Sequence, residues 1–138
     1  MSLRSKARTC ALQMLFQWEV GKQDPHTIEE GFWHMTRSEK NTRAFANELF
    51  EGAVADAAAV DALLADHIQN WRVERVSVID RAILRLGAHE LRRGKTPPKV
   101  VLNESVELAK EFSGEDAGSF INGVLDALWH ALPKKKEG

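Results

Sequence analysis

Apolar residues recur every three or four positions along most of this chain, and this spacing is typical of amphipathic helices. No stretch shows a convincing alternation of apolar and polar residues, which is the pattern of a half-buried strand. Gly21 and the Asp24-Pro25 pair interrupt the first periodic segment. The sequence therefore predicts an all-α protein. In the first segment the apolar residues of one helical face are Ala7, Cys10, Ala11, Met14, Leu15 and Trp18.

The same spacing predicts the remaining helices. A short helix is expected over residues 26–35, and a long Ala-rich helical region over residues 38–69. Gly52 and Asp56 favour a break that would divide this long region into two helices. Three more helices follow, which makes about seven in total. Their capping and breaking signals are Ser77, Gly94, Thr96-Pro97-Pro98, Ser113-Gly114 and Pro133.

The helix that follows Ser77 is apolar around much of its circumference. A helix of this kind is usually the central one of a bundle, because several neighbours cover it. We expect its polar residues to face solvent or partners; they include Asp80, Arg81, Arg85 and Arg92.

Chain length and short connections complete the predicted architecture. The 138 residues are enough for one domain with a real core. Short connections favour antiparallel neighbours, and we expect two small helical bundle subdomains within the single domain. They would cover residues 1–69 and 77–132, followed by a basic tail at residues 133–138.

One pair of residues sets local propensity against packing. Asn122-Gly123 favours a turn, but the apolar residues on both sides keep helical phase through the pair. A turn would remove large side chains from the core at about 1.5–3 kcal/mol each, whereas Gly costs a helix about 1 kcal/mol. We therefore predict that Gly123 is helical. We also predict that its missing side chain lets the helix through Ile83 and Leu86 approach closely.

Positive charge is clustered at the N-terminus, although the formal net charge of the chain is only −1. Arg4, Lys6 and Arg8, here called the basic head, precede the first acidic residue, Glu19. The basic head runs directly into an apolar helical stripe, which is the pattern of an RNA-binding arm attached to a packed helix. We expect all three side chains to lie off the apolar face. A second basic cluster lies within residues 72–95.

The composition argues against a secreted or membrane protein. No apolar run approaches the roughly 20 residues needed to cross a bilayer, and the basic N-terminus is not followed by the continuous apolar segment of a signal peptide. The single cysteine, Cys10, rules out an internal disulfide and fits a reducing cytosol. We therefore expect a cytoplasmic protein without membrane contact.

The sequence shows no recognisable catalytic arrangement. No glycine-rich loop leads into Lys-Ser or Lys-Thr, as a phosphate-binding loop requires. The five histidines form no i, i+4 pair and no His-Glu-x-x-His motif. Cys10 lies on the apolar stripe and is expected to be a core residue. We therefore expect no enzyme activity, no metal and no cofactor.

Phe120 has two interpretations. It follows the polar bend at residues 113–116, and an exposed aromatic side chain at a helix start can stack on an unpaired base. Its spacing alone favours a core position instead.

Three parts of the chain together resemble the NusB family of bacterial transcription antitermination factors. Each segment is short, but their order and spacing together are specific. The resemblance rests on Arg8-Thr9-Cys10-Ala11-Leu12-Gln13 through Trp18, Ile79-Asp80-Arg81-Ala82-Ile83-Leu84-Arg85, Glu90-Leu91, Pro98-Lys99-Val100, Asn103-Glu104, Glu107-Leu108-Ala109-Lys110 and Phe120-Ile121-Asn122-Gly123-Val124-Leu125-Asp126.

The resemblance implies an all-helical protein that binds the boxA element of nascent ribosomal-operon RNA. It implies that binding occurs together with NusE, a small-subunit ribosomal protein, inside an antitermination complex with RNA polymerase. The basic head is less Arg-rich than is usual in the family, which implies weaker intrinsic RNA affinity. At matching positions, Arg4, Lys6 and Arg8 would hold RNA phosphates, Asp116 and Phe120 would face the RNA, and Phe16 and Asp80 would face NusE.

Two alternatives remain open. The same helical fold serves as the RNA-binding module that precedes a ribosomal-RNA methyltransferase, although no catalytic domain follows Pro133 in this sequence. The chain could also be a helical protein-interaction adaptor without an RNA role. Binding to boxA-like RNA distinguishes an antitermination factor from such an adaptor.

Overall fold

A computed structural model describes residues 2–69 and 71–133, so the predicted basic tail lies almost wholly outside the described residues. The described residues contain helices and no strand, which confirms the all-α prediction, and the helix count is close to the predicted seven. None of the described helices is long and apolar enough to cross a membrane. The elements are α1 (Leu3–Gly21), α2 (Pro25–Met35), α3 (Lys40–His67), the 3₁₀ helix η1 (Val73–Arg75), α4 (Val78–Arg93), α5 (Pro98–Phe112) and α6 (Ala117–Ala131).

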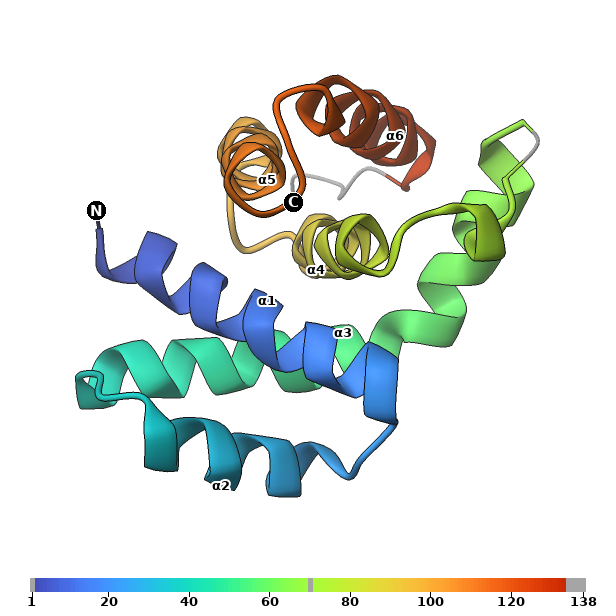
Figure 1. Cartoon of the computed structure of the whole chain (residues 1–138). Helices are drawn as coiled ribbons and strands as arrows, with labels where there is room; N and C mark the ends of the chain where they lie inside the picture. Colours follow the sequence, from blue (N-terminus) through green and yellow to red (C-terminus); the bar gives the residue numbers. More distant parts are fainter. Residues whose placement is uncertain (1, 70, 134–138) are drawn as a thin grey trace.

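Helix α4 is the centre of the fold, as its wide apolar face predicts. Figure 1 shows α1 and α3 on one side of α4, with α2 beyond them, and α5 and α6 on the other side. Every residue of α4 from 82 to 91 is buried. One cluster of buried side chains includes residues of all six α-helices. The division into two subdomains stays a prediction.

The expectation that Arg85 faces solvent or a binding partner is wrong. Arg85 is buried at 6% exposure, where it forms ion pairs with Glu19 and, at 2.9 Å, with Asp61. Its guanidinium also donates to the backbone carbonyl of Ala57 at 3.2 Å. Acidic partners on α1 and α3 therefore allow a charged residue to occupy a buried position of α4, and a helical-face pattern cannot reveal such partners.

The predicted break near Gly52 is wrong, because α3 is one continuous helix from Lys40 to His67. The apolar phase continues past Gly52 through Ala53, Ala57 and Val60, which are all buried. A Cβ atom on Gly52 would collide with the His89 ring of α4. Gly52 therefore allows close contact between α3 and α4, and this packing outweighs the helix cost of about 1 kcal/mol for a glycine.

Gly123 is helical, as predicted, but the predicted close approach of a neighbouring helix is wrong. Gly123 lies within α6 and is exposed, and a Cβ atom there would meet nothing within 4 Å. The glycine that does permit close helix contact is Gly87 of α4. A Cβ atom on Gly87 would lie 2.7 Å from Leu125 Cδ1 and 2.8 Å from Ser105 Oγ.

Candidate nucleic-acid interface

The first turn of α1 presents two exposed cations at a capped helix end. Ser2 is the N-cap, and its hydroxyl accepts a hydrogen bond from the Ser5 backbone N–H at 3.1 Å. Arg4 and Lys6 are both exposed. The Arg4 guanidinium carbon lies 4.2 Å from the centre of the Phe45 ring on α3, within the range of a cation–π contact. These two cations are therefore carried by an ordered helix and are accessible to a ligand.

The third residue of the basic head, Arg8, is buried, and the expectation that it lies off the apolar face is wrong. Arg8 is only 2% exposed. Its Nε and Nη2 atoms donate to the two carboxylate oxygens of Glu90 on α4, at 2.9 and 2.8 Å. A phosphate would have to displace Glu90 to reach this guanidinium.

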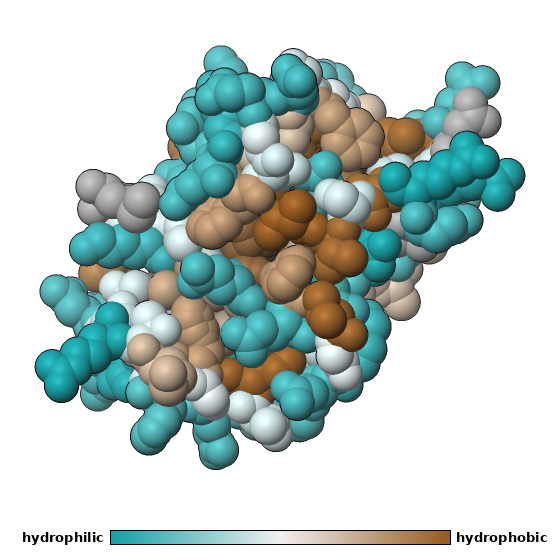
Figure 2. All heavy atoms as spheres, viewed as in Figure 1, coloured by the Kyte–Doolittle hydropathy of each residue, from teal (hydrophilic) through white to brown (hydrophobic). Residues whose placement is uncertain are grey.

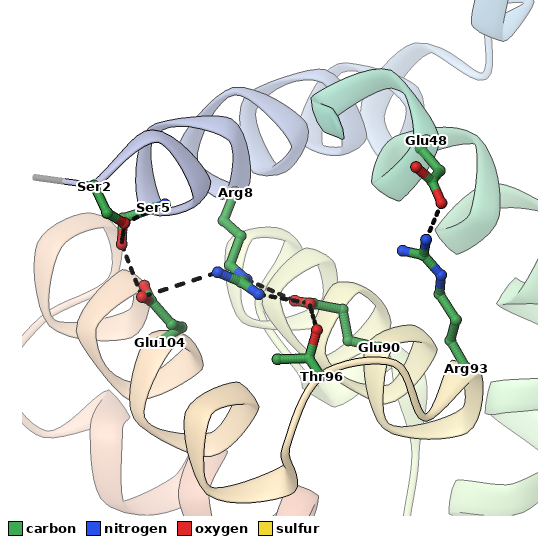
Figure 3. Close-up of polar contacts among 8 residues, drawn as sticks. All are labelled: Ser2, Ser5, Arg8, Glu48, Glu90, Arg93, Thr96 and Glu104. Atoms are coloured by element: carbon green, nitrogen blue, oxygen red, sulfur yellow. Dashed lines mark hydrogen bonds and ion pairs between the residues drawn. The ribbon is translucent and has the colours of Figure 1, made fainter. Parts of the chain in front are cut away.

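The polar contacts around Arg8 join three helices (Figure 3). Glu104 of α5 lies 3.9 Å from Arg8 Nη1 and accepts a hydrogen bond from the Ser5 hydroxyl at 2.7 Å. The Thr96 hydroxyl, in the connection between α4 and α5, lies 3.5 Å from Glu90. The network therefore ties the first turns of α1 to α4 and α5, and it holds the exposed Arg4 and Lys6 in a defined orientation.

The charge of Arg8 is stabilised despite its burial. Burial by itself opposes the charged form, but the hydrogen bond and the attraction of Glu90, with a contribution from Glu104, outweigh that effect and raise the pKa of Arg8. The guanidinium therefore stays charged, and its bidentate pairing with Glu90 is the geometry in which Arg binds carboxylates most strongly.

A hollow of about 740 Å³ lies beside the exposed head, and we call it the head groove. Its lining includes Arg4 and Phe45, the residues Arg93, Lys95 and Pro97 from the end of α4 and the following connection, and the carboxylates Glu48 and Glu104. Sequence reasoning noted a basic cluster within residues 72–95 but did not connect it with the head. Arg93 is paired with Glu48, whereas Lys95 is an exposed cation that lines the head groove with Arg4.

Asp116 and Phe120 lie together at the start of α6. Asp116 is the N-cap residue and is exposed, and Phe120 follows one helical turn later. Phe120 is 43% exposed, so the core interpretation suggested by its spacing is wrong. Among the described residues, no hydrogen bond or ion pair joins either of them to the basic head. The structure therefore presents an accessible aromatic ring and a carboxylate on a separate helix.

A second hollow, of about 800 Å³, is apolar, and we call it the apolar groove. Figure 2 shows apolar side chains gathered in the middle of the face that is viewed in Figure 1. Phe16 projects from α1 into this groove and is 39% exposed. Asp80 is half-buried and directly follows Ile79, which lines the groove. The apolar lining residues are Leu12, Phe16, Phe32, Met35, Ile79 and Phe112.

The family model described as "NusB family" matches residues 5–129, nearly the whole chain. The chain belongs to the NusB family. Transcription antitermination protein NusB of Sorangium cellulosum (strain So ce56) is 44% identical over 129 residues, covering 93% of this chain and 92% of the relative. NusB of Koribacter versatilis (strain Ellin345) is 41% identical over 136 residues, covering 97% of this chain and 93% of the relative.

A solved structure of NusB shares this fold. A crystal structure of the antitermination factors NusB and NusE in complex with dsRNA matches with a TM-score of 0.86 and 29% sequence identity. The match covers 96% of this chain and 99% of that chain. This NusB-family chain is therefore a transcription antitermination factor by family, with the helical architecture of a protein that has been crystallised with RNA and NusE.

The thiol of Cys10 and one cluster of potential metal ligands lie outside the two grooves of this NusB-family chain. Cys10 is half-buried against the core, and burial raises the pKa of its thiol, which makes it a weak nucleophile at neutral pH. Among the described residues, His26, Glu29 and Glu51 form a group that could hold a metal ion, and none of the three lines either groove.

Proposed function

We propose that this NusB-family chain binds boxA-type single-stranded RNA together with NusE, within the RNA polymerase antitermination complex of ribosomal-RNA operons, in the cytoplasm. The observation that carries the proposal is the exposed pair Arg4 and Lys6 on a helix end that Arg8 and Glu90 anchor to α4. The likeness to a NusB solved with NusE and dsRNA supports the part of the proposal that concerns RNA and NusE.

Phosphate contacts and base stacking are the expected sources of RNA affinity. Arg4 and Lys6 are accessible to phosphates, and Lys95 lines the head groove together with Arg4. The exposed ring of Phe120 can stack on a base that is not paired, a contact worth about 1–3 kcal/mol. With about four phosphate contacts, the logarithm of affinity should fall with the logarithm of salt concentration at a slope near −3.

A filter-binding assay tests the function as a whole. We expect tighter binding of a boxA-like RNA than of a scrambled RNA of the same length, and a further gain when NusE is added. A duplex of the same sequence should bind less tightly, because paired bases are not available to Phe120. Equal binding of the boxA-like and scrambled RNAs, with and without NusE, would instead favour a protein-interaction adaptor.

Replacing both Arg4 and Lys6 by alanine is expected to weaken RNA binding without unfolding the protein. Both side chains are exposed, so their loss removes phosphate contacts rather than core packing. The salt slope should become less steep by about 1.4, at about 0.7 for each phosphate contact. Filter binding over a series of salt concentrations measures the slope.

The matched control for the head variant is Arg72→Ala with Arg75→Ala, which removes two exposed cations from the connection between α3 and α4. This control changes the net charge equally and should leave the slope close to that of the wild type. Equal slopes for the wild type and the head variant would remove Arg4 and Lys6 from the RNA contact.

The apolar groove is the surface that we propose for NusE. Phe16 offers a partly exposed aromatic ring, and Ile79 brings the first turn of α4 to the same hollow. Asp80 adds a negative charge beside this apolar surface, and its Oδ1 atom has no hydrogen-bond partner. An apolar centre with a charged residue at its side is the usual anatomy of a protein interface.

Substituting Asp80→Lys is expected to weaken NusE binding while the protein stays folded. Asp80 lies in the first turn of α4, where its backbone N–H donates to Ser77 Oγ at 3.2 Å and its negative charge favours the helix N-terminus. A lysine there should cost about 0.5–1 kcal/mol of folding stability. Calorimetric titration with NusE measures the affinity, and Asp66→Lys, an exposed charge reversal on α3, is the control. Wild-type affinity in Asp80→Lys would exclude Asp80 from this interface.

A further inference from the structure

Three potential metal ligands meet where the first turns of α2 face α3. His26 and Glu29 lie on α2, and Glu51 lies on α3. One ligand atom from each residue, the Nδ1 of the histidine or a carboxylate oxygen, lies within 4.8 Å of the other two. Ligand atoms around one transition-metal ion, each about 2.1 Å from it, are separated by about 3–4 Å. Small rotations of the exposed His26 and Glu51 side chains therefore bring all three onto one ion.

The carboxylate of Glu29 is buried and only partly paired. Glu29 is 8% exposed, and its Oε2 atom has no hydrogen-bond partner. The nearest basic atom, His26 Nδ1, is 3.5 Å from Oε1, which is longer than a normal hydrogen bond. A buried carboxylate oxygen without a partner is costly, and an ion bound between Glu29 and its neighbours His26 and Glu51 would satisfy it.

We propose that His26, Glu29 and Glu51 bind a divalent transition-metal ion of the zinc class. The imidazole nitrogen disfavours Mg²⁺ and Ca²⁺, which select oxygen ligands. Two carboxylates balance the charge of a divalent ion, and one nitrogen with two oxygens is a donor set that zinc accepts. His26 and Glu51 are exposed, so the ion can enter from solvent and complete its coordination with water.

The ion would join α2 to α3. Helix α2 packs mainly on α1 and α3, at the edge of the fold (Figure 1). The same helix contributes Phe32 and Met35 to the apolar groove. A metal link at its first turns would therefore hold the helix that forms one wall of that groove. This consequence is independent of RNA binding by the basic head.

Titration of the chelator-treated, buffer-exchanged protein with zinc chloride tests the proposal. We expect one saturable site per chain by calorimetry, and an increase in melting temperature when zinc is added. His26→Ala and Glu51→Gln change exposed side chains, so the protein should stay folded. Each variant should raise the Kd for zinc by about tenfold or more. The same titration with magnesium chloride should give no saturable binding.

His34→Ala and Glu30→Gln are the matched controls. They remove an exposed histidine and an exposed carboxylate from the same helix, outside the cluster. Both should bind zinc as the wild type does. The proposal is overturned if the wild type shows no saturable site, if His26→Ala and Glu51→Gln keep wild-type affinity, or if the controls lose as much affinity as the cluster variants.

Discussion

Substituting Arg8→Ala is expected to lower the free energy of unfolding by about 3–5 kcal/mol. The substitution leaves the Glu90 carboxylate buried at 3% exposure without its bidentate partner. It also removes the ion-pair partner of Glu104 and the weaker contact, at 5.7 Å, between the guanidinium and the Phe45 ring. Urea unfolding followed by circular dichroism measures the loss.

Arg4→Ala is the matched control, because Arg4 lies one turn earlier on the same helix and is exposed. Its effect on the free energy of unfolding should stay within about 0.5–1 kcal/mol. The double variant Arg8→Met with Glu90→Met should be more stable than Arg8→Met alone, because it removes the unpaired buried charge. If Arg8→Ala were as stable as Arg4→Ala, the ion pair with Glu90 would not anchor α1.

The Arg8 variants also separate anchoring from RNA contact. Arg8 could affect RNA binding only by holding the basic head in position. In that case Arg8→Ala should lose RNA affinity because the first turn of α1 becomes disordered. The double variant Arg8→Met with Glu90→Met should then recover part of the RNA affinity. The salt slope of that double variant should then match the wild-type slope, because no phosphate contact has been removed. A slope that is less steep by about 0.7 would show that Arg8 contacts RNA directly.

Substituting Gly87→Ala is expected to destabilise the fold by about 1–3 kcal/mol, although alanine is the better helix former. The added Cβ would lie 2.7 Å from Leu125 Cδ1 and 2.8 Å from Ser105 Oγ, which are closer than normal contacts. Leu125 is 0% exposed and Ser105 is 5% exposed, so any adjustment of either side chain would take place within the packed core. Either these side chains would have to leave their present rotamers or α5 and α6 would have to shift away from α4. Denaturant unfolding measures the effect.

Gly123→Ala is the control for Gly87→Ala, and it should have the opposite sign. Gly123 is also within a helix, but it is exposed and a Cβ atom there would meet nothing within 4 Å. The expected result is a gain of up to about 1 kcal/mol from helix propensity. A stability gain in Gly87→Ala, or a loss in Gly123→Ala, would show that Cβ contact does not decide the requirement for glycine in these helices.

The sequence by itself determined the helices and the family. Helical phase was readable because each amphipathic helix repeats its apolar face every turn, and this local pattern survives whatever the helix packs against. The same helical phase correctly predicted that α6 continues through Asn122-Gly123. It also identified α4 as the central helix, since only a helix with several neighbours needs so wide an apolar face. The two exposed cations of the head were visible for a similar reason, because they precede Ala7, the first residue of the buried apolar face of α1.

Only the tertiary structure decided which polar and small residues meet across helices. Arg8 is buried because Glu90 lies opposite it on α4, and the two residues are 82 positions apart in the chain. Gly52 and Gly87 are required by His89 and by Leu125 with Ser105, not by a local bend or turn. Glu51 joins His26 and Glu29 only because α2 folds back on α3. Periodicity reports which side of a helix faces inward, whereas the identity of the atoms that a side chain meets there depends on a neighbour that is distant in sequence.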